Sequence, residues 1–228
     1  MDRATLARLN AARHARKAVI SATPLDGDGP TELHFDATTP SLPLADALGA
    51  AFASGKAQSV MIGQKSYFLN PYLPAPRLVI IGAVHISQHL APMAQATGLD
   101  VTIIDPRSAF ASPERFAGQR LIADWPQEAL GEGRLDRRTA LAALSHDPKL
   151  DDWPLIAALQ AGCFYVGALG SRKSHAKRVE RLRSAGLPPE QIARIHGPIG
   201  LPIGAANPAE IAVATLAQVI GQLRRVER

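Results

Sequence analysis

Hydrophobic positions in the second two thirds of the chain follow two alternating patterns. Short apolar runs, typical of buried strands, fall at residues 78–82, 101–105, 139–145 and 163–167, with a weaker one at 120–123. Apolar residues spaced three or four positions apart, typical of amphipathic helices, fall at residues 84–97, 149–161, 172–185 and 208–224. Strand and helix patterns that alternate in this way predict an α/β domain with a parallel sheet.

The N-terminal part of the chain has a different pattern. It predicts an Arg-rich helix over residues 3–17, a strand over 18–22 and a second helix over 43–55. Residues 59–70 predict a hairpin that turns at Gly63–Gln64, because glycine supplies the positive φ of a type II′ turn. These few elements are too small for a full doubly wound sheet.

A proline-rich segment, NPYLPAP at residues 70–76, separates the two patterns. It cannot continue a helix or a central strand, and we expect a semi-rigid connector there. The sequence therefore predicts a small α+β region over residues 1–73, followed by a Rossmann-like parallel sheet domain over residues 74–228.

Composition narrows the classes of protein that are compatible with this fold. The 228 residues are 46% hydrophobic and 20% charged, which favours a packed core over disorder. A net charge of +5 suits anionic ligands, whereas an aromatic content of only 5% argues against a nucleic-acid partner. We see no secretory signal and no apolar run that could span a membrane. The simplest expectation is a cytoplasmic protein without an integral membrane segment.

The turn after the first apolar run resembles a dinucleotide-binding turn with two changes. Such a turn has the pattern G-x-G-x-x-G, and this chain keeps Gly82 but has Val84 and Ser87 in place of the second and third glycines. The second glycine normally allows the backbone to approach a pyrophosphate. His85, in the first turn of the following helix, could instead donate a hydrogen bond into the crevice.

Two charged residues follow the second apolar run. Asp105 lies 23 residues after Gly82, close to the position that binds a ribose hydroxyl in dinucleotide folds. The alternative is a carboxylate that only caps the loop before Pro106. Arg107 suits a phosphate or a carboxylate better than a neutral ribose.

The segment YVGALGSRKSHAKR combines a strand, two glycines and a basic helix start. Gly167 and Gly170 precede Ser171, which opens a helix with Arg172 and Lys173 in its first turn. Free backbone N–H groups, the helix dipole and fixed cations together form an anion site. The alternative is a solvated basic face, but the unfavourable position of these cations favours a bound anion at Arg172.

The remaining candidates for chemistry are weaker. His146 begins the segment SHDPKLDD, whose later acids are explained by the N-terminus of a helix. The histidines show no metal-binding spacing, so we expect no metal site. Cys163, the only cysteine, opens a buried strand and is expected to be a packed, inert thiol.

Three segments together resemble the XdhC/CoxI family, whose members are accessory proteins that mature xanthine dehydrogenase and carbon monoxide dehydrogenase. They are IIGAVHISQHLAPMAQATGLDVTIIDPRSAF, LSHDPKLDDWPLIAAL with FYVGALGSRKSHAKR, and RIHGPIGLPIGAANPAEIAVATLAQVI. The resemblance covers residues 77–222. The N-terminal part lacks the Gly-Ser-x-Pro-Arg and Gly-Gly-Cys-Val-Glu segments of longer members. The absence of the cysteine-bearing segment argues against a role in sulfuration of a bound cofactor more than against binding of the cofactor.

The resemblance implies a maturation chaperone that is not itself an enzyme. Such a protein binds molybdenum cofactor, as molybdopterin or its dinucleotide form, and delivers it to a molybdenum hydroxylase client. A cysteine desulfurase is a possible further partner, and a homodimer is left open. The cofactor-binding candidates are Gly82, His85, Asp105, Arg107, His146, Gly167, Gly170, Ser171 and Arg172.

Two other functions are compatible with the same pattern. The strand–Gly–helix–strand–Asp order supports an NAD(P)-dependent oxidoreductase with a degenerate fingerprint, although Val84 opposes it. The second of these functions is that of a protein–protein adaptor, which would keep the fold and bind no small molecule.

Overall fold

The structure is a computed structural model that describes residues 1–27, 29–35, 42–131 and 134–226. The chain divides into two compact units. One is built mainly from Met1–Pro74 and the other from Ala75–Leu223. The change from one unit to the other falls in the proline-rich segment.

The first unit is an antiparallel sheet with two helices. Its strand order is β2-β1-β4-β3, and Ile20, Leu48 and Leu69 are fully buried in its core. The β3–β4 hairpin turns at Gly63–Gln64, as the sequence predicts, and Gly63 has a φ of +63°. The elements are α1 (Arg3–His14), β1 (Val19–Pro24), β2 (Glu32–His34), α2 (Leu42–Ser54), β3 (Gln58–Ile62) and β4 (Lys65–Tyr72).

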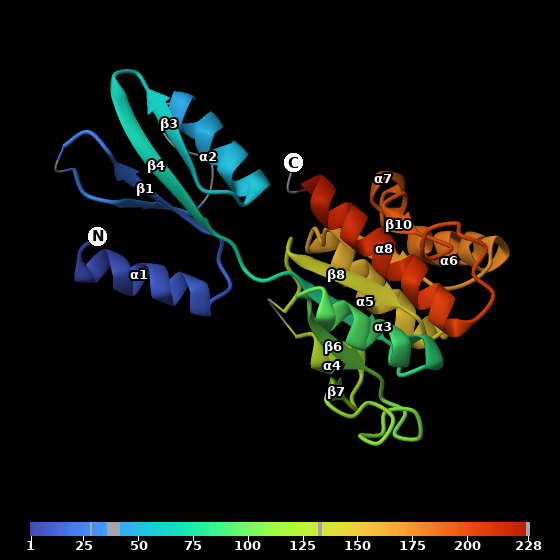
Figure 1. The fold of residues 1–228 in the computed structure, drawn as a ribbon. Helices are drawn as coiled ribbons and strands as arrows, with labels where there is room; N and C mark the ends of the chain where they lie inside the picture. The colour runs from blue at the N-terminus through green and yellow to red at the C-terminus, as the bar shows by residue number, and fades with distance from the viewer. Residues whose placement is uncertain (28, 36–41, 132–133, 227–228) are drawn as a thin grey trace. The chain divides into compact units, whose positions relative to one another are not determined.

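The second unit contains a six-stranded sheet in which all neighbouring strands are parallel (Figure 1). The strand order is β10-β9-β8-β5-β6-β7. The chain therefore runs outward from β5 to β7 and then returns to place β8 on the other side of β5. The strands are β5 (Arg77–Ile81), β6 (Asp100–Ile104), β7 (Arg120–Ile122), β8 (Thr139–Ala143), β9 (Tyr165–Ala168) and β10 (Ile195–His196).

Helices cover both faces of this sheet and form a three-layer domain. Alternate residues of each buried strand point to opposite faces, so the sheet contributes to two separate apolar cores. One core holds α3 (His85–Ala96) and α8 (Pro208–Val226). The other holds α4 (Pro126–Ala129), α5 (Pro148–Gln160), α6 (Arg172–Ser184) and α7 (Pro189–Ile192).

The Rossmann-like parallel sheet predicted from the sequence is confirmed. α8 begins at Pro208, as the hydrophobic pattern predicts, and Asn207 Oδ1 accepts from the Glu210 N–H at 2.9 Å. The prediction missed β10 and the two four-residue helices, because two to four residues are too few to show a hydrophobic period. It also missed β2, a three-residue edge strand whose side chains are only partly buried.

Candidate functional site

The loops at the carboxyl ends of β5 and β8 meet at the point where the strand order reverses. In open parallel sheets this switch point is where ligands bind. Gly82 follows β5 with a φ of +108°, and a Cβ on it would lie 3.0 Å from the Ser145 backbone nitrogen. Gly82 is therefore required for the two loops to pack closely, whether or not a ligand is present.

The turn after β5 is held by its own side chains where a dinucleotide fold would use glycines. Ser87, in the third-glycine position, is buried, and its Oγ donates to the Gly82 carbonyl at 2.6 Å. The Ala83 N–H donates to Asp105 Oδ2 at 2.8 Å and is no longer free for a phosphate. Val84 precedes α3 without capping it through a side chain. Ser87, which replaces the third glycine, and Asp105 thus close the turn internally.

Asp105 and Arg107 form a rigid pair at the end of β6. The Asp105 side chain is fully buried, and its Oδ1 accepts from the N–H and the Nε of Arg107, both at 2.9 Å. Its Oδ2 accepts from Arg107 Nη2 at 2.7 Å and from the Ala83 N–H. Burial alone would raise the pKa of Asp105, but these bonds from Arg107 and Ala83 outweigh it and lower the pKa.

The consequence of this pairing is that Arg107, and not Asp105, is available to a ligand. Both oxygens of Asp105 are occupied by donors of the chain itself, so the carboxylate orients Arg107 and the turn after β5. One third of the Arg107 side chain is exposed. Its guanidinium lies 4.4 Å from the centre of the Phe110 ring. Its Nη1 has no hydrogen bond to any residue that the structure describes.

A second polar group lies between the carboxyl ends of β8 and β9. Asp151, in the first turn of α5, is 1% exposed, and its Oδ1 accepts from Ser145 Oγ at 2.7 Å. Arg178 of α6 is 4% exposed, and its Nη2 donates to the Leu169 carbonyl at 2.9 Å. Within the described chain, Asp151 Oδ2 and the Nε and Nη1 of Arg178 are buried without a hydrogen-bond partner.

Electrostatic interactions connect this group to the switch point. Arg178 interacts with Asp151 and lowers the pKa of His146, to which burial makes the larger contribution. Asp147 and Asp151 in turn act on Arg107. The loop after β6 and the starts of α5 and α6 therefore bring positive and negative charges together at this edge of the sheet.

The turn from β9 into α6 has the geometry expected of an anion site. Gly170 has a φ of +136°, and Ser171 is the N-cap, with its Oγ accepting from the Ser174 N–H at 3.2 Å. Arg172 and Lys173 are exposed, and their backbone N–H groups have no acceptor in the described part of the chain. This arrangement leaves two donors and two cations at the positive end of the helix dipole.

The other predicted residues have different surroundings. Gly167 is buried in β9, where a Cβ would overlap Ile199 at 2.8 Å, so it serves close packing. His85 is exposed at the start of α3. His146 adopts a φ of +63°, in the left-handed region that residues other than glycine rarely adopt, and its ring is partly shielded from solvent.

Two residues of the site, Asp151 and Arg178, were missed in the sequence, although a signal was present. Arg178 shares a helical face with the buried Leu182 and the half-buried His175, at spacings of four and three residues. Asp151 lies on the same helical face as the buried Leu155, four residues further along α5. A charged residue at the buried position of a helical period is the feature that could have identified both.

The buried carboxyl of Asp151 leads to a prediction about stability and pH. Burial raises its pKa to about 6 from the ordinary 3.8, so the folded state favours the protonated form. That stabilising contribution is complete below the ordinary pKa and is lost as the pH rises through about 6. Asp151→Asn keeps the acceptor for Ser145 and cannot ionise. Relative to wild type, we expect it to gain about 2–3 kcal/mol between pH 4 and 7.5.

Urea denaturation across this pH range measures the difference between the two proteins. Asp100→Asn, at an exposed carboxylate in β6, is the control and should match wild type throughout. A difference between Asp151→Asn and wild type that does not change with pH would contradict the prediction.

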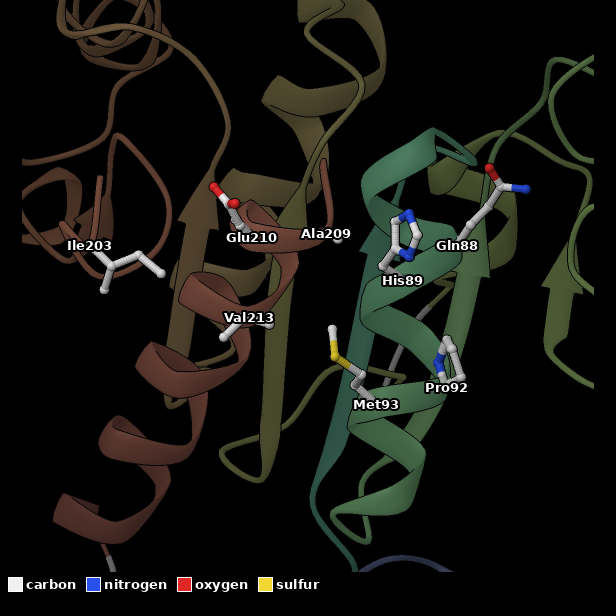
Figure 2. A pocket seen from close by; sticks show the side chains of 8 residues that line it. All are labelled: Gln88, His89, Pro92, Met93, Ile203, Ala209, Glu210 and Val213. Atoms are coloured by element: carbon white, nitrogen blue, oxygen red, sulfur yellow. The ribbon is translucent and has the colours of Figure 1, made fainter. Parts of the chain in front are cut away.

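A separate groove of about 360 Å³ lies between α3 and the first half of α8 (Figure 2). Its polar side chains are largely engaged elsewhere: Glu210 accepts from the Ala206 N–H, and Gln88 donates to the Arg115 carbonyl. The remaining lining is His89 together with apolar side chains, and Figure 2 shows His89 and Met93 on the side of α3 toward α8. No predicted cofactor-binding residue lines it.

Features that would indicate other chemistry are absent from the described residues. They contain no cluster of three or more histidine, cysteine, aspartate or glutamate side chains arranged to hold a metal ion. No helix in the described ranges is long and apolar enough to cross a membrane. Cys163 is fully buried, and burial raises its pKa to about 12, which makes its thiol unreactive.

The fold and these loops define a class of protein, namely a Rossmann-type domain in which the turn after β5 is closed by the chain's own side chains. Residues 78–219 match the family model of the XdhC Rossmann domain. Because the match covers more than half of the chain, the chain belongs to the XdhC family.

Curated relatives agree with this assignment and are longer than the chain. A probable xanthine dehydrogenase subunit of Bacillus subtilis is 32% identical over 160 residues, which are 70% of this chain and 46% of that protein. The "Molybdenum cofactor insertion chaperone PaoD" of Escherichia coli is 32% identical over 148 residues, which are 65% of this chain and 40% of that protein. A third relative, "Uncharacterized protein YqeB" of Escherichia coli, is 30% identical over 69% of this chain and 29% of its own length. The chain thus spans less than half of each relative.

A solved structure shares the fold. The crystal structure of a xanthine dehydrogenase from Bacillus halodurans superposes with a TM-score of 0.64 and 24% identity. The match includes 98% of this chain and 65% of the chain in that crystal structure. At that identity the similarity supports the architecture and not the activity.

Proposed function

We propose that this protein binds molybdenum cofactor at the carboxyl edge of its parallel sheet and passes it to a molybdenum hydroxylase. The proposal rests on the groups at the carboxyl edge of this sheet, in a chain that belongs to the XdhC family. It presents one oriented guanidinium, from Arg107, and one helix N-terminus with exposed cations, at Arg172. One relative is named as a cofactor insertion chaperone, which supports the same role.

The residues at this edge fit an anionic, polar cofactor. Molybdopterin carries a phosphate, which the N–H groups and cations at the start of α6 suit. Arg107 and His85 are placed to address the pterin or, in a dinucleotide form, the second phosphate. Asp105 would act indirectly, by holding Arg107 in one orientation.

The same geometry argues against an NAD(P)-dependent oxidoreductase. A dinucleotide fold uses the carboxylate at the end of its second strand to accept from the ribose, and here Asp105 is buried with both oxygens occupied. The Ala83 N–H, which would face a pyrophosphate, is engaged as well. We therefore retain the non-enzymatic role.

Sulfuration of the cofactor would need a partner. The only cysteine of the sequence, Cys163, is fully buried, so its thiol cannot carry sulfur to a ligand. A cysteine desulfurase acting on the bound cofactor would supply it. Handover to the hydroxylase within a complex would keep the oxidation-prone dithiolene away from solvent.

Anaerobic calorimetry with released molybdenum cofactor, NAD and NADP tests the proposal directly. Binding of the cofactor with a stoichiometry of one per chain, without measurable binding of the two nicotinamide dinucleotides, is the expected result. Tight NAD binding together with hydride transfer to an acceptor would reject it. Binding of none of the three would favour a protein–protein adaptor.

A charge substitution locates the phosphate more closely. Arg172→Ala should weaken cofactor binding by about ten- to a hundred-fold, because one charge-assisted hydrogen bond contributes about 1.5–3 kcal/mol. Arg183→Ala removes the same charge near the other end of α6 and should change the affinity little. Both side chains are exposed, so thermal stability should stay close to wild type.

The comparison of the two variants separates a specific site from a diffuse one. Equal losses in both would indicate general attraction to a basic face. No loss in Arg172→Ala would move the phosphate to Arg107 and the N-terminus of α3.

A further inference from the structure

We propose that the start of α6 is a built subsite for the phosphate oxyanion of the ligand, with the buried Arg178 as its anchor and Asp151 as the group that takes up a proton when the anion enters. This inference rests on the proposed function for the identity of the ligand, but not for the existence of the subsite. Neither residue was among the sequence-based candidates.

The position of the Arg178 guanidinium carries the proposal. Side chains of an α-helix lean toward its N-terminus, and Arg178 reaches back to the turn between β9 and α6. There its Nη2 donates to the Leu169 carbonyl at 2.9 Å. A Cβ on Gly170 would lie 3.2 Å from Ser174 Cβ and 3.9 Å from Arg178 Nη2, so Gly170 packs directly against both side chains. The guanidinium therefore lies beneath the same turn whose N–H groups are free.

The hydrogen bonds of Arg178 are incomplete. It is 4% exposed, and its Nε and Nη1 are buried with no acceptor among the described residues. Leaving donors of a buried charged group unpaired is costly, and burial accordingly lowers the pKa of Arg178. An oxyanion at the start of α6, admitted by a small movement of the turn, would satisfy these donors together with the N–H groups of Arg172 and Lys173.

An oxyanion bound at the start of α6 would lie near the carboxylate of Asp151, and protonation of Asp151 would remove the repulsion between the two. Asp151 is 1% exposed, its Oδ2 has no partner in the described chain, and burial raises its pKa to about 6. An approaching anion disfavours the ionised form further, so Asp151 would take one proton from solvent and become a hydrogen-bond donor. Binding of one oxyanion is then coupled to uptake of about one proton.

The charged groups around Asp151 determine the direction of this coupling. Arg178 from α6 favours the ionised carboxyl, and the neighbouring Asp152 opposes it. Arg107, in the loop after β6, also interacts with Asp151. Besides these charges, His146 and His175 lie near Arg178, and burial together with Arg178 lowers the pKa of each. Protonation of these histidines in acid would also strengthen anion binding, so a variant of Asp151 is needed to separate their contribution from that of Asp151.

Sulfate is a suitable probe because its charge does not change across the relevant pH range. Amide NMR shifts of residues 170–174 on the full chain, at constant ionic strength, give its affinity. We expect sulfate to bind at these amides, and Arg178→Met to weaken binding by about ten-fold or more. Lys177→Met removes an exposed charge one residue away and should change the affinity less than about two-fold. No sulfate binding by wild type, or equal losses in both variants, would overturn the subsite.

Asp151→Asn provides a test that does not depend on the folding of Arg178→Met. It should bind sulfate more tightly than wild type at pH 7.5, and its affinity should rise less than that of wild type as the pH falls to 5.5. A merely structural role for Asp151 predicts neither change. Equal affinities and equal pH dependence in the two proteins would overturn the proton uptake.

The cofactor itself distinguishes failure of this inference from failure of the proposed function. Released molybdenum cofactor should displace sulfate from residues 170–174 if its phosphate occupies the subsite. Sulfate that stays bound beside the cofactor would overturn the assignment of the subsite to the cofactor phosphate. Sulfate binding without any cofactor binding would reject the proposed function and leave the oxyanion subsite standing.

Discussion

Replacement of Asp105 by alanine is expected to lower the free energy of unfolding by about 3–5 kcal/mol, because it removes the buried carboxylate of an ion pair and leaves its donors unpaired. Asp105 is fully buried and accepts four hydrogen bonds, three from Arg107 and one from the Ala83 N–H. The variant leaves the Ala83 N–H unpaired and releases the orientation of Arg107. Urea denaturation at pH 7 measures the loss.

The pH dependence of the same comparison has a defined sign. The pKa of Asp105 is lowered in the folded state, so its stabilising contribution is present above the ordinary value of 3.8 and is lost as the pH falls through the lowered value. The difference between wild type and Asp105→Ala should therefore shrink in acid. Asp100→Asn, in the same strand, should cost less than about 0.5 kcal/mol. A loss for Asp105→Ala no larger than this control would show that the pair is not a structural one.

Substitution of Gly82 by alanine is the second change with a large expected effect. The residue has a φ of +108°, where a side chain adds strain of about 1–3 kcal/mol. Its Cβ would lie 3.0 Å from the Ser145 nitrogen and 3.1 Å from Ser145 Cα, both in backbone, and crowding of this kind costs about another 1–3 kcal/mol. We expect a total loss of about 3–5 kcal/mol, measured by urea denaturation.

Gly98→Ala is the matched control for Gly82→Ala. Gly98 follows α3 with a φ of +87°, and a Cβ there would meet nothing within 4 Å. It reports the backbone strain alone, so it should cost about 1–2 kcal/mol. Equal losses in the two variants would mean that the loops after β5 and β8 separate readily. A larger loss at Gly82 would confirm their close packing.

The parallel sheet and its order of elements could be predicted because each strand and helix carries its own hydrophobic period. The roles of individual polar residues could not be obtained in the same way. Six cations lie in α6, and although the helical period places Arg178 on the buried face with Leu182, it does not show which groups the guanidinium meets. The bond from the Ala83 N–H to Asp105 joins residues 22 positions apart, so only the folded chain shows it.

Alternatives left open by the sequence are narrowed by these contacts. Asp105 could bind a ribose or serve the loop, and its four internal hydrogen bonds favour the second interpretation. The roles of His85 and Arg172 remain predictions, since both are exposed and depend on a ligand for their partners. Binding experiments with variants of these residues are needed to establish their roles.

Under the proposed delivery role, the closed turn after β5 has a consequence for the release of the ligand. Ser87 and Asp105 complete the hydrogen bonds of this turn from within the chain, so its order does not depend on cargo. A carrier built in this way keeps the same shape when empty and when loaded. Such a carrier can release its cargo without unfolding the turn and accept the next one without first refolding it, which suits the proposed role in repeated delivery.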